Sequence, residues 1–275
     1  MKGQGMRWVW AVGLVVCGLG GAALAERPLD TRVVMSGHSL TDPIPDMLRP
    51  MVQAAGGRGA VIDRSTIPGS PMDWRWNNRA SPVDARHDIA DYDLLVLTER
   101  VPLLNTMTYH NSPDEALRWA RHAWENGAET VLYASWTSWV TGDDGEDDEA
   151  RAGLDFRERL RREWARWQEV QDHVNAHRPD DMPQVDMIPG PPIMLALKDA
   201  IAAGTAPGLG DIRDLFRDNI HVNDTGAWLM ALAHYAVIYN RDPRDVPDRL
   251  GRSPVPEPEL AAFLKDLVAE VVAQR

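Results

Sequence analysis

Two short segments near opposite ends of the chain carry residues that could perform nucleophilic chemistry. In the first, Ser39 follows an apolar run at 33–35 and precedes Asp42-Pro43, a pair typical of a helix start. Such a junction would place the hydroxyl at the carboxyl edge of a sheet, where backbone N–H groups and a helix dipole favour developing negative charge. The alternative is that Ser39 is only a turn or capping residue.

The matching base lies far downstream, where a loop leads into an apolar helix. Two residues separate Asp218 from His221, so a turn would let the carboxylate reach the imidazole. The carboxylate would fix the tautomer of His221 while the imidazole takes the proton of Ser39. The alternative is an ordinary helix-entry loop with a surface histidine. Together, the two segments indicate a Ser-His-Asp hydrolase more strongly than either does alone.

These segments resemble sequence blocks of the SGNH (GDSL-type) hydrolases. Gly37-His38-Ser39-Leu40 is similar to the first block, and Asp218-Asn219-Ile220-His221 is similar to the last. Gly69 stands where the second block has a glycine of the oxyanion hole. The resemblance extends over about residues 30–240. It implies that the N–H groups of Ser39 and Gly69 bind the oxyanion.

The sequence departs from the family pattern at two places. His38 replaces the aspartate that usually precedes the serine, and its role stays open. The third block, Gly-x-Asn-Asp in the family, is replaced by Leu97-Thr98-Glu99-Arg100, so the asparagine donor is not visible. Either Thr98 or Asn105 could partly replace that donor. Alternatively, Glu99 and Arg100 simply pair with each other.

The elements that must position these residues alternate between strands and helices. Strands are predicted over 33–35, 59–62, 93–97, 130–134 and 185–188, and helices over 43–55, 113–126, 150–177, 193–203, 224–239 and 259–273. This alternation predicts a three-layer α/β/α sandwich with a five-stranded parallel sheet. The family resemblance adds a flavodoxin-like strand order. The candidate site residues would then meet at the carboxyl ends of the strands.

A long loop predicted over 63–80 carries Gly69 together with Trp74 and Trp76. Loops of this length in a compact domain are usually functional or disordered. The two tryptophans form either a lid packed on the core or a platform on which a sugar stacks. Trp136, just after the fourth predicted strand, is a further candidate for the pocket wall or for the core.

The chain of 275 residues is predicted to hold a signal peptide at 1–25 and a single domain at 26–275. A basic start, an apolar run at 8–19 and Ala23-Leu24-Ala25 are typical of a bacterial export signal. The mature protein is therefore expected in the periplasm or outside the cell, with no membrane segment. Within the domain, the core covers about 30–240, and a proline-rich segment and a final helix occupy 241–275.

The formal net charge of −12 argues against nucleic acid as a partner, because an acidic surface repels phosphates. No cofactor and no metal are predicted. The acidic run 142–149 lacks the alternating ligand spacing of a calcium loop, and His173 and His177 lack a third ligand.

We expect an exported serine esterase acting on an acylated small molecule or polysaccharide. The resemblance, the export signal and the loop tryptophans suggest O-acetyl or other short acyl groups on a carbohydrate. One alternative is a periplasmic acetyltransferase or transacylase with the same triad. Another is a non-catalytic carbohydrate-binding protein on a degenerate hydrolase scaffold, motivated by His38 and the altered third block.

Overall fold

The computed structural model describes residues 25–140 and 153–274. Residues 1–24 of the expected signal peptide and the acidic run 142–149 lie outside the described residues, so export stays a prediction. Among the described helices, none has the length and apolar character needed to cross a bilayer.

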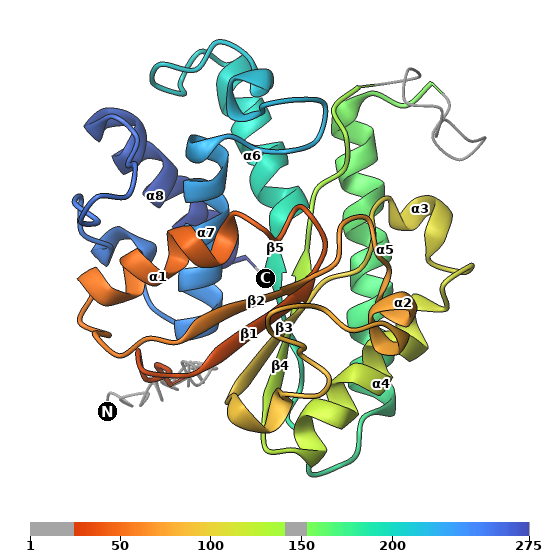
Figure 1. Ribbon diagram of the computed structural model, residues 1–275. Coiled ribbons are helices and arrows are strands. Elements are labelled where there is room, and N and C mark those ends of the chain that lie inside the picture. Colours follow the sequence, from red (N-terminus) through yellow and green to blue (C-terminus); the bar gives the residue numbers. More distant parts are fainter. Residues whose placement is uncertain (1–24, 141–152, 275) are drawn as a thin grey trace, which may run out of the picture.

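Five parallel strands form one sheet in the order β2-β1-β3-β4-β5 (Figure 1). Their bounds are β1 Val33–Gly37, β2 Ile62–Thr66, β3 Leu94–Leu97, β4 Glu129–Ala134 and β5 Asp186–Pro189. All residues of β1 and β3 are buried, as expected where helices cover both faces of a parallel sheet. The predicted three-layer architecture and flavodoxin-like strand order are confirmed.

Helices cover both faces of this sheet (Figure 1). On one face α1 packs against α7, and α8 lies against α7; on the other, α4 packs against α5. Helix α6, which follows the edge strand β5, contacts α5 of one layer and α8 of the other. The α-helices are α1 Ile44–Ala54, α2 Met72–Asn77, α3 Leu103–Thr106, α4 Ser112–Glu125, α5 Phe156–His177, α6 Gly190–Ala202, α7 Asp224–Tyr239 and α8 Pro258–Val272. The 3₁₀ turns are Ile89–Asp91, Ile212–Leu215 and Pro243–Asp245.

Helix α7, which begins three residues after the candidate base His221, is held firmly in the core. Every residue from Gly226 to Tyr239 is buried, because the sheet, α1 and α8 enclose this helix. A helix that is apolar all round is buried rather than amphipathic.

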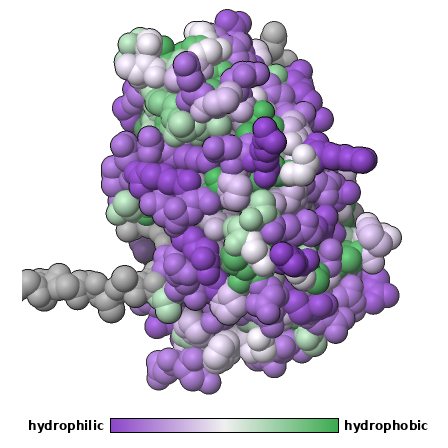
Figure 2. All heavy atoms as spheres, turned by 90° about the vertical axis from the view of Figure 1, so that its left-hand side faces the viewer, coloured by the Kyte–Doolittle hydropathy of each residue, from purple (hydrophilic) through white to green (hydrophobic). Residues whose placement is uncertain are grey.

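The face of the molecule seen in Figure 2 is mostly hydrophilic, with apolar side chains in small scattered groups.

The structure corrects two predicted details near the site. The second strand begins at Ile62, where the predicted strand ends, and the expected loop at 63–80 contains the rest of β2 and α2. Asp42 does not cap α1, because its carboxylate accepts a hydrogen bond from the Thr66 hydroxyl at 2.6 Å instead. The Thr66 hydroxyl at the end of β2 therefore binds the side chain that the sequence assigned to the helix start.

Candidate active site

The end of β1 brings Ser39 to the carboxyl edge of the sheet. Gly37 is required there for steric reasons, since a Cβ at this position would lie 2.1 Å from Thr41 Oγ1. The N–H of Thr41 donates to the carbonyl of His38 at 2.8 Å, which closes the turn. Ser39 is half-buried on that turn. Close packing, rather than an unusual backbone angle, thus explains the glycine.

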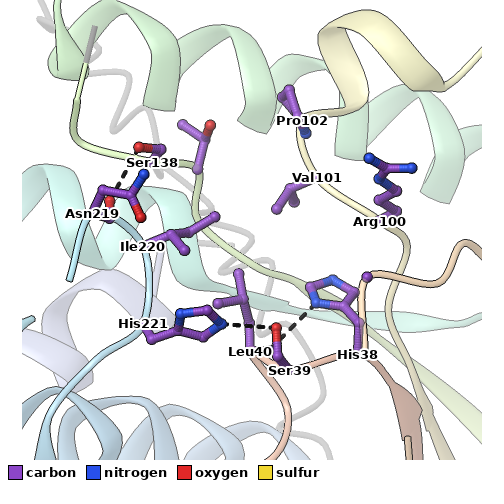
Figure 3. Close-up of a pocket in the computed structure, with 12 residues that line it drawn as sticks. His38, Ser39, Leu40, Arg100, Val101, Pro102, Ser138, Asn219, Ile220 and His221 are labelled. Atoms are coloured by element: carbon purple, nitrogen blue, oxygen red, sulfur yellow. Dashed lines mark hydrogen bonds between the residues drawn. The ribbon is translucent and has the colours of Figure 1, made fainter. Parts of the chain in front are cut away.

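The loop before α7 brings His221 to this hydroxyl. His221 Nε2 lies 2.9 Å from Ser39 Oγ (Figure 3). Its Nδ1 lies 2.8 Å from Asp218 Oδ2. The carboxylate accepts from Nδ1–H, so Nε2 is left to accept the serine proton. Sequence reasoning predicted this group of three residues, and the structure brings all three together.

Asp218 is held in place by its own loop. Its Oδ1 accepts from the N–H groups of Ile220 at 2.9 Å and His221 at 2.7 Å. Partial burial raises the pKa of the Asp218 carboxyl, but these bonds and the imidazole outweigh it and hold the pKa below its ordinary value. The carboxylate, about half of whose side chain is exposed, therefore stays ionised near neutral pH.

The segment after β4 clamps the loop that carries Asp218 and His221. Trp136 Nε1 donates to the carbonyl of Ile220 at 2.7 Å, and Trp139 Nε1 donates to that of Asp218 at 2.9 Å. The carbonyl of Asn219 accepts from the Trp139 N–H at 3.0 Å and from the Ser138 hydroxyl at 3.1 Å. Three successive carbonyls of the loop are thus fixed by one neighbouring segment.

Gly69 lines the same pocket as His221 and lies on a tight turn. Its φ of +66° is in the left-handed region that favours glycine, and a Cβ there would meet no atom within 4 Å. No backbone carbonyl among the described residues accepts from the N–H of Ser39 or of Gly69. These two groups are suited to bind an oxyanion.

Together these segments enclose a pocket of about 260 Å³ (Figure 3). It is lined by His38, Ser39, Leu40, Gly69, Arg100, Val101, Pro102, Thr137, Ser138, Asn219, Ile220 and His221. The lining combines the hydroxyl and imidazole with short apolar walls. Such a small, mixed pocket suits a compact acyl group better than a long chain.

Within the altered third block Arg100 lines this pocket, whereas Leu97, Thr98 and Glu99 do not. The hydroxyl of Thr98 donates to the carbonyl of Tyr133 at 2.7 Å, so it is used within the sheet. Glu99 is fully buried, and its Oε1 accepts from the N–H groups of Met72 at 2.9 Å and Arg100 at 2.6 Å. Burial raises the pKa of Glu99, and the charge of Arg75 opposes that rise. Neither residue replaces the asparagine donor.

His38 has a positioning role that its sequence place did not reveal. Its Nε2 lies 3.0 Å from the carbonyl of Glu99, which can only accept, so Nε2 carries the proton. Its Nδ1 then accepts from the N–H of Leu40 at 3.4 Å. Burial, reinforced by the charge of Arg75, lowers the pKa of His38 to about 3. A neutral His38 therefore ties the nucleophile turn to the end of β3.

The other candidate residues lie outside the pocket lining. Asn105 is half-buried with its Oδ1 enclosed, and no described hydrogen bond reaches that oxygen. Trp76 is buried against Trp119, with ring centroids 5.2 Å apart, so its role is packing. Trp136 is buried and acts through its bond to Ile220. Trp74 is 55% exposed.

Sequence reasoning missed the pocket wall formed by Arg100, Val101 and Pro102, and it missed the buried Arg75. The wall directly follows β3, so its place at the carboxyl end of a buried strand was an available signal. Arg75 gave no such signal, because two of its partners, Ser36 and the carbonyl of Thr98, come from segments distant in sequence. Within residues 25–140 and 153–274, no group of three or more His, Cys, Asp or Glu is arranged to hold a metal ion.

Comparison with solved structures shows what this fold resembles. A DUF4886 family protein from Bacteroides uniformis superposes with a TM-score of 0.65 at 12% identity, covering 88% of this chain and 95% of the other. A Bacillus subtilis protein gives a TM-score of 0.48 at 12% identity, covering 76% and 56%. A Streptococcus pneumonia protein, provisionally described as a platelet activating factor, gives 0.41 at 14%, covering 76% and 85%.

No protein-family model matches this sequence, and no curated protein sequence matches it significantly. At these identities the first superposition describes the fold, a three-layer α/β/α sandwich, and the chemistry must be argued from the site itself.

Proposed function

We propose that this protein is a serine hydrolase of the SGNH type that cleaves short-chain carboxylic esters. The observation that carries the proposal is the continuous hydrogen-bonded series Ser39–His221–Asp218, in which Ser39 and His221 line one small pocket together with Gly69. A merely structural histidine would have no reason to bridge a half-buried serine hydroxyl and an ionised carboxylate there. The geometry matches the roles of nucleophile, base and orienting group.

In the proposed reaction, Ser39 Oγ attacks the ester carbonyl carbon while His221 Nε2 takes the hydroxyl proton. The carbonyl oxygen becomes negative and is bound by the N–H groups of Ser39 and Gly69. The bond to the alcohol then breaks, and His221 returns the proton to the leaving oxygen. Water, deprotonated by the same imidazole, attacks the acyl-enzyme and releases the acid and free Ser39.

The direct test is turnover of 4-nitrophenyl acetate together with labelling by a serine-directed fluorophosphonate. We expect burst release of nitrophenol, one label per chain located at Ser39, and loss of both in Ser39→Ala. Ser253→Ala is the matched control, because Ser253 is half-buried like Ser39 but lies outside the pocket lining. A wild-type protein that neither turns over the ester nor takes the label would refute the proposal and favour a non-catalytic binding protein.

We further propose that the natural ester is an acylated carbohydrate. Trp74 and Tyr109 are the large apolar side chains exposed on the described surface, at 55% and 85%. Asp73, which precedes Trp74, and His110, which follows Tyr109, are in contact: Asp73 Oδ2 lies 3.2 Å from His110 Nδ1. This contact links the two segments that carry the exposed aromatic rings. Trp74 follows the Gly69 turn and Tyr109 follows the pocket wall at Pro102. Exposed aromatic rings offer apolar faces on which sugars stack.

The carbohydrate proposal is tested with an O-acetylated xylan. In Trp74→Ala and Tyr109→Ala we expect kcat/KM on the polymer to fall by about two- to tenfold, the size of one aromatic contact, with 4-nitrophenyl acetate unaffected. Equal rates of acetate release from the polymer in wild type and both variants would contradict a sugar-stacking role. Acetyl transfer to an added oligosaccharide in place of acetate release would indicate a transacylase.

A further inference from the structure

The side chain of Arg75 lies fully buried beneath the candidate site, where it connects three segments. Its Nε donates to the hydroxyl of Ser36 in β1 at 3.1 Å. Its Nη1 donates to the carbonyl of Ser70 at 2.5 Å and approaches the Ser70 hydroxyl at 3.4 Å. Its Nη2 donates to the carbonyl of Thr98, just after β3. Burial lowers its pKa to about 10, so the guanidinium stays charged at neutral pH.

The turn that presents Gly69 is tied at both ends. At its start, the N–H of Ile67 donates to the carbonyl of Gly37 at 3.1 Å, which links the turn to β1. Across the turn, the carbonyl of Ile67 accepts from the N–H of Ser70 at 3.2 Å and from its hydroxyl at 2.7 Å. At its end, Arg75 holds the carbonyl of Ser70. Arg75 therefore holds the end of the turn that presents Gly69.

The segment in the third-block position completes this arrangement. Arg75 binds the carbonyl of Thr98, and His38 binds the next carbonyl, that of Glu99. The Glu99 carboxylate accepts from the N–H of Met72, the first residue of α2, which carries Arg75. Thr98 and Glu99 do not line the pocket. Through these two residues the segment instead anchors both the nucleophile turn and the helix that follows the Gly69 turn.

We propose that Arg75 is a positioning residue for the oxyanion hole. The guanidinium connects the Gly69 turn, the end of β1 and the end of β3, so that the N–H groups of Gly69 and Ser39 converge on one point. This inference rests on the proposed esterase function. A two-donor oxyanion hole depends on exact placement of both donors, because misplacement by about 1 Å can cost about 100-fold in rate.

Arg75→Lys separates placement from charge. Lysine keeps the positive charge but cannot reach three acceptors with one ammonium group. We expect kcat on 4-nitrophenyl acetate to fall by about 10- to 100-fold with KM changed less than threefold. Affinity for a trifluoromethyl ketone, which forms a tetrahedral oxyanion on Ser39, should fall by a similar factor. The pH at which activity rises should not move, since the base is unchanged.

Arg178→Lys is the matched control. Arg178 also donates to backbone carbonyls, including that of Met182 at 2.9 Å, but it lies after the C-terminus of α5, outside the pocket lining. We expect it to leave kcat and inhibitor affinity unchanged. If Arg75→Lys does not fold, Ser36→Ala removes only the acceptor of Nε, and kcat should fall by about three- to tenfold with KM retained.

The outcomes distinguish this inference from the function on which it rests. A wild type without turnover or labelling refutes the esterase proposal. An active wild type with unchanged kcat and ketone affinity in folded Arg75→Lys and Ser36→Ala refutes the role of Arg75. The role of Arg75 is also refuted if Arg75→Lys raises KM by as large a factor as it lowers kcat. The same holds if Arg178→Lys lowers kcat by the same factor, because a general loss of structural order would then explain both effects.

Discussion

At the scale of single residues, the site joins groups from opposite ends of the chain. Ser39 and His221 are 182 residues apart in sequence, yet their side-chain atoms lie 2.9 Å apart. The third member, Asp218, is about half exposed, whereas orienting carboxylates in such arrangements are often buried. Two N–H bonds from its own loop provide the fixation that burial does not.

Asp218→Asn tests the orienting carboxylate. The amide would stabilise the wrong tautomer of His221 and would not stabilise the imidazolium, so we expect kcat to fall by about 100- to 10,000-fold. Steady-state kinetics on 4-nitrophenyl acetate measure this change. Asp224→Asn, an exposed acid three residues beyond His221, is the control and should stay near wild type. Equal activity in the two variants would show that the carboxylate has no catalytic role.

At the scale of elements, the segment after β4 determines where the base lies. Trp136, Ser138 and Trp139 together bind three successive carbonyls of the 218–221 loop. The same loop closes on itself, since the N–H of Arg217 donates to the carbonyl of His221 at 2.8 Å. The base is therefore held by a rigid neighbour rather than by the loop alone.

Trp136→Phe removes the donor to Ile220 while keeping an aromatic ring. We expect kcat to fall by about tenfold, because one hydrogen bond of about 1 kcal/mol and the loop geometry are lost. Trp167→Phe is the matched control: Trp167 is equally buried, but its Nε1 has no described hydrogen-bond partner. Kinetics and thermal unfolding of both variants separate the effects. A parallel loss of kcat in both would show that packing, not the Ile220 bond, is responsible.

Local patterns predicted most elements because they follow from short-range physics. The helix over 224–239 and the strand near 94–97 appear as expected, since an apolar run of that length has few alternatives. The second strand was misplaced because Asp63 and Arg64 within it are polar and incompletely buried. The roles of Thr98, Glu99 and Arg75 could not be predicted, because each depends on partners from other strands and loops.

At the scale of the whole molecule, two buried histidines make stability depend on pH. Burial lowers the pKa of His38 to about 3 and that of His234 to about 4, against about 6.5 in an unfolded chain. Between these values the unfolded chain binds protons that the folded chain does not. The free energy of unfolding therefore falls as the pH decreases below about 6.5. The lowered pKa of Asp218 acts in the same direction at lower pH.

His234→Phe tests this dependence away from the site. His234 bonds to the carbonyl of Met230 at 2.7 Å and faces the ring of Tyr133, whose pKa burial raises, so no neighbouring charge complicates its titration. Between pH 6 and 4.5 we expect the free energy of unfolding to change less steeply with pH in the variant than in the wild type, by up to about 1.4 kcal/mol per pH unit. Urea unfolding at several pH values measures it. Exposed His177→Gln should keep the wild-type slope, and a wild-type slope in His234→Phe would mean that this histidine is already protonated in the folded protein.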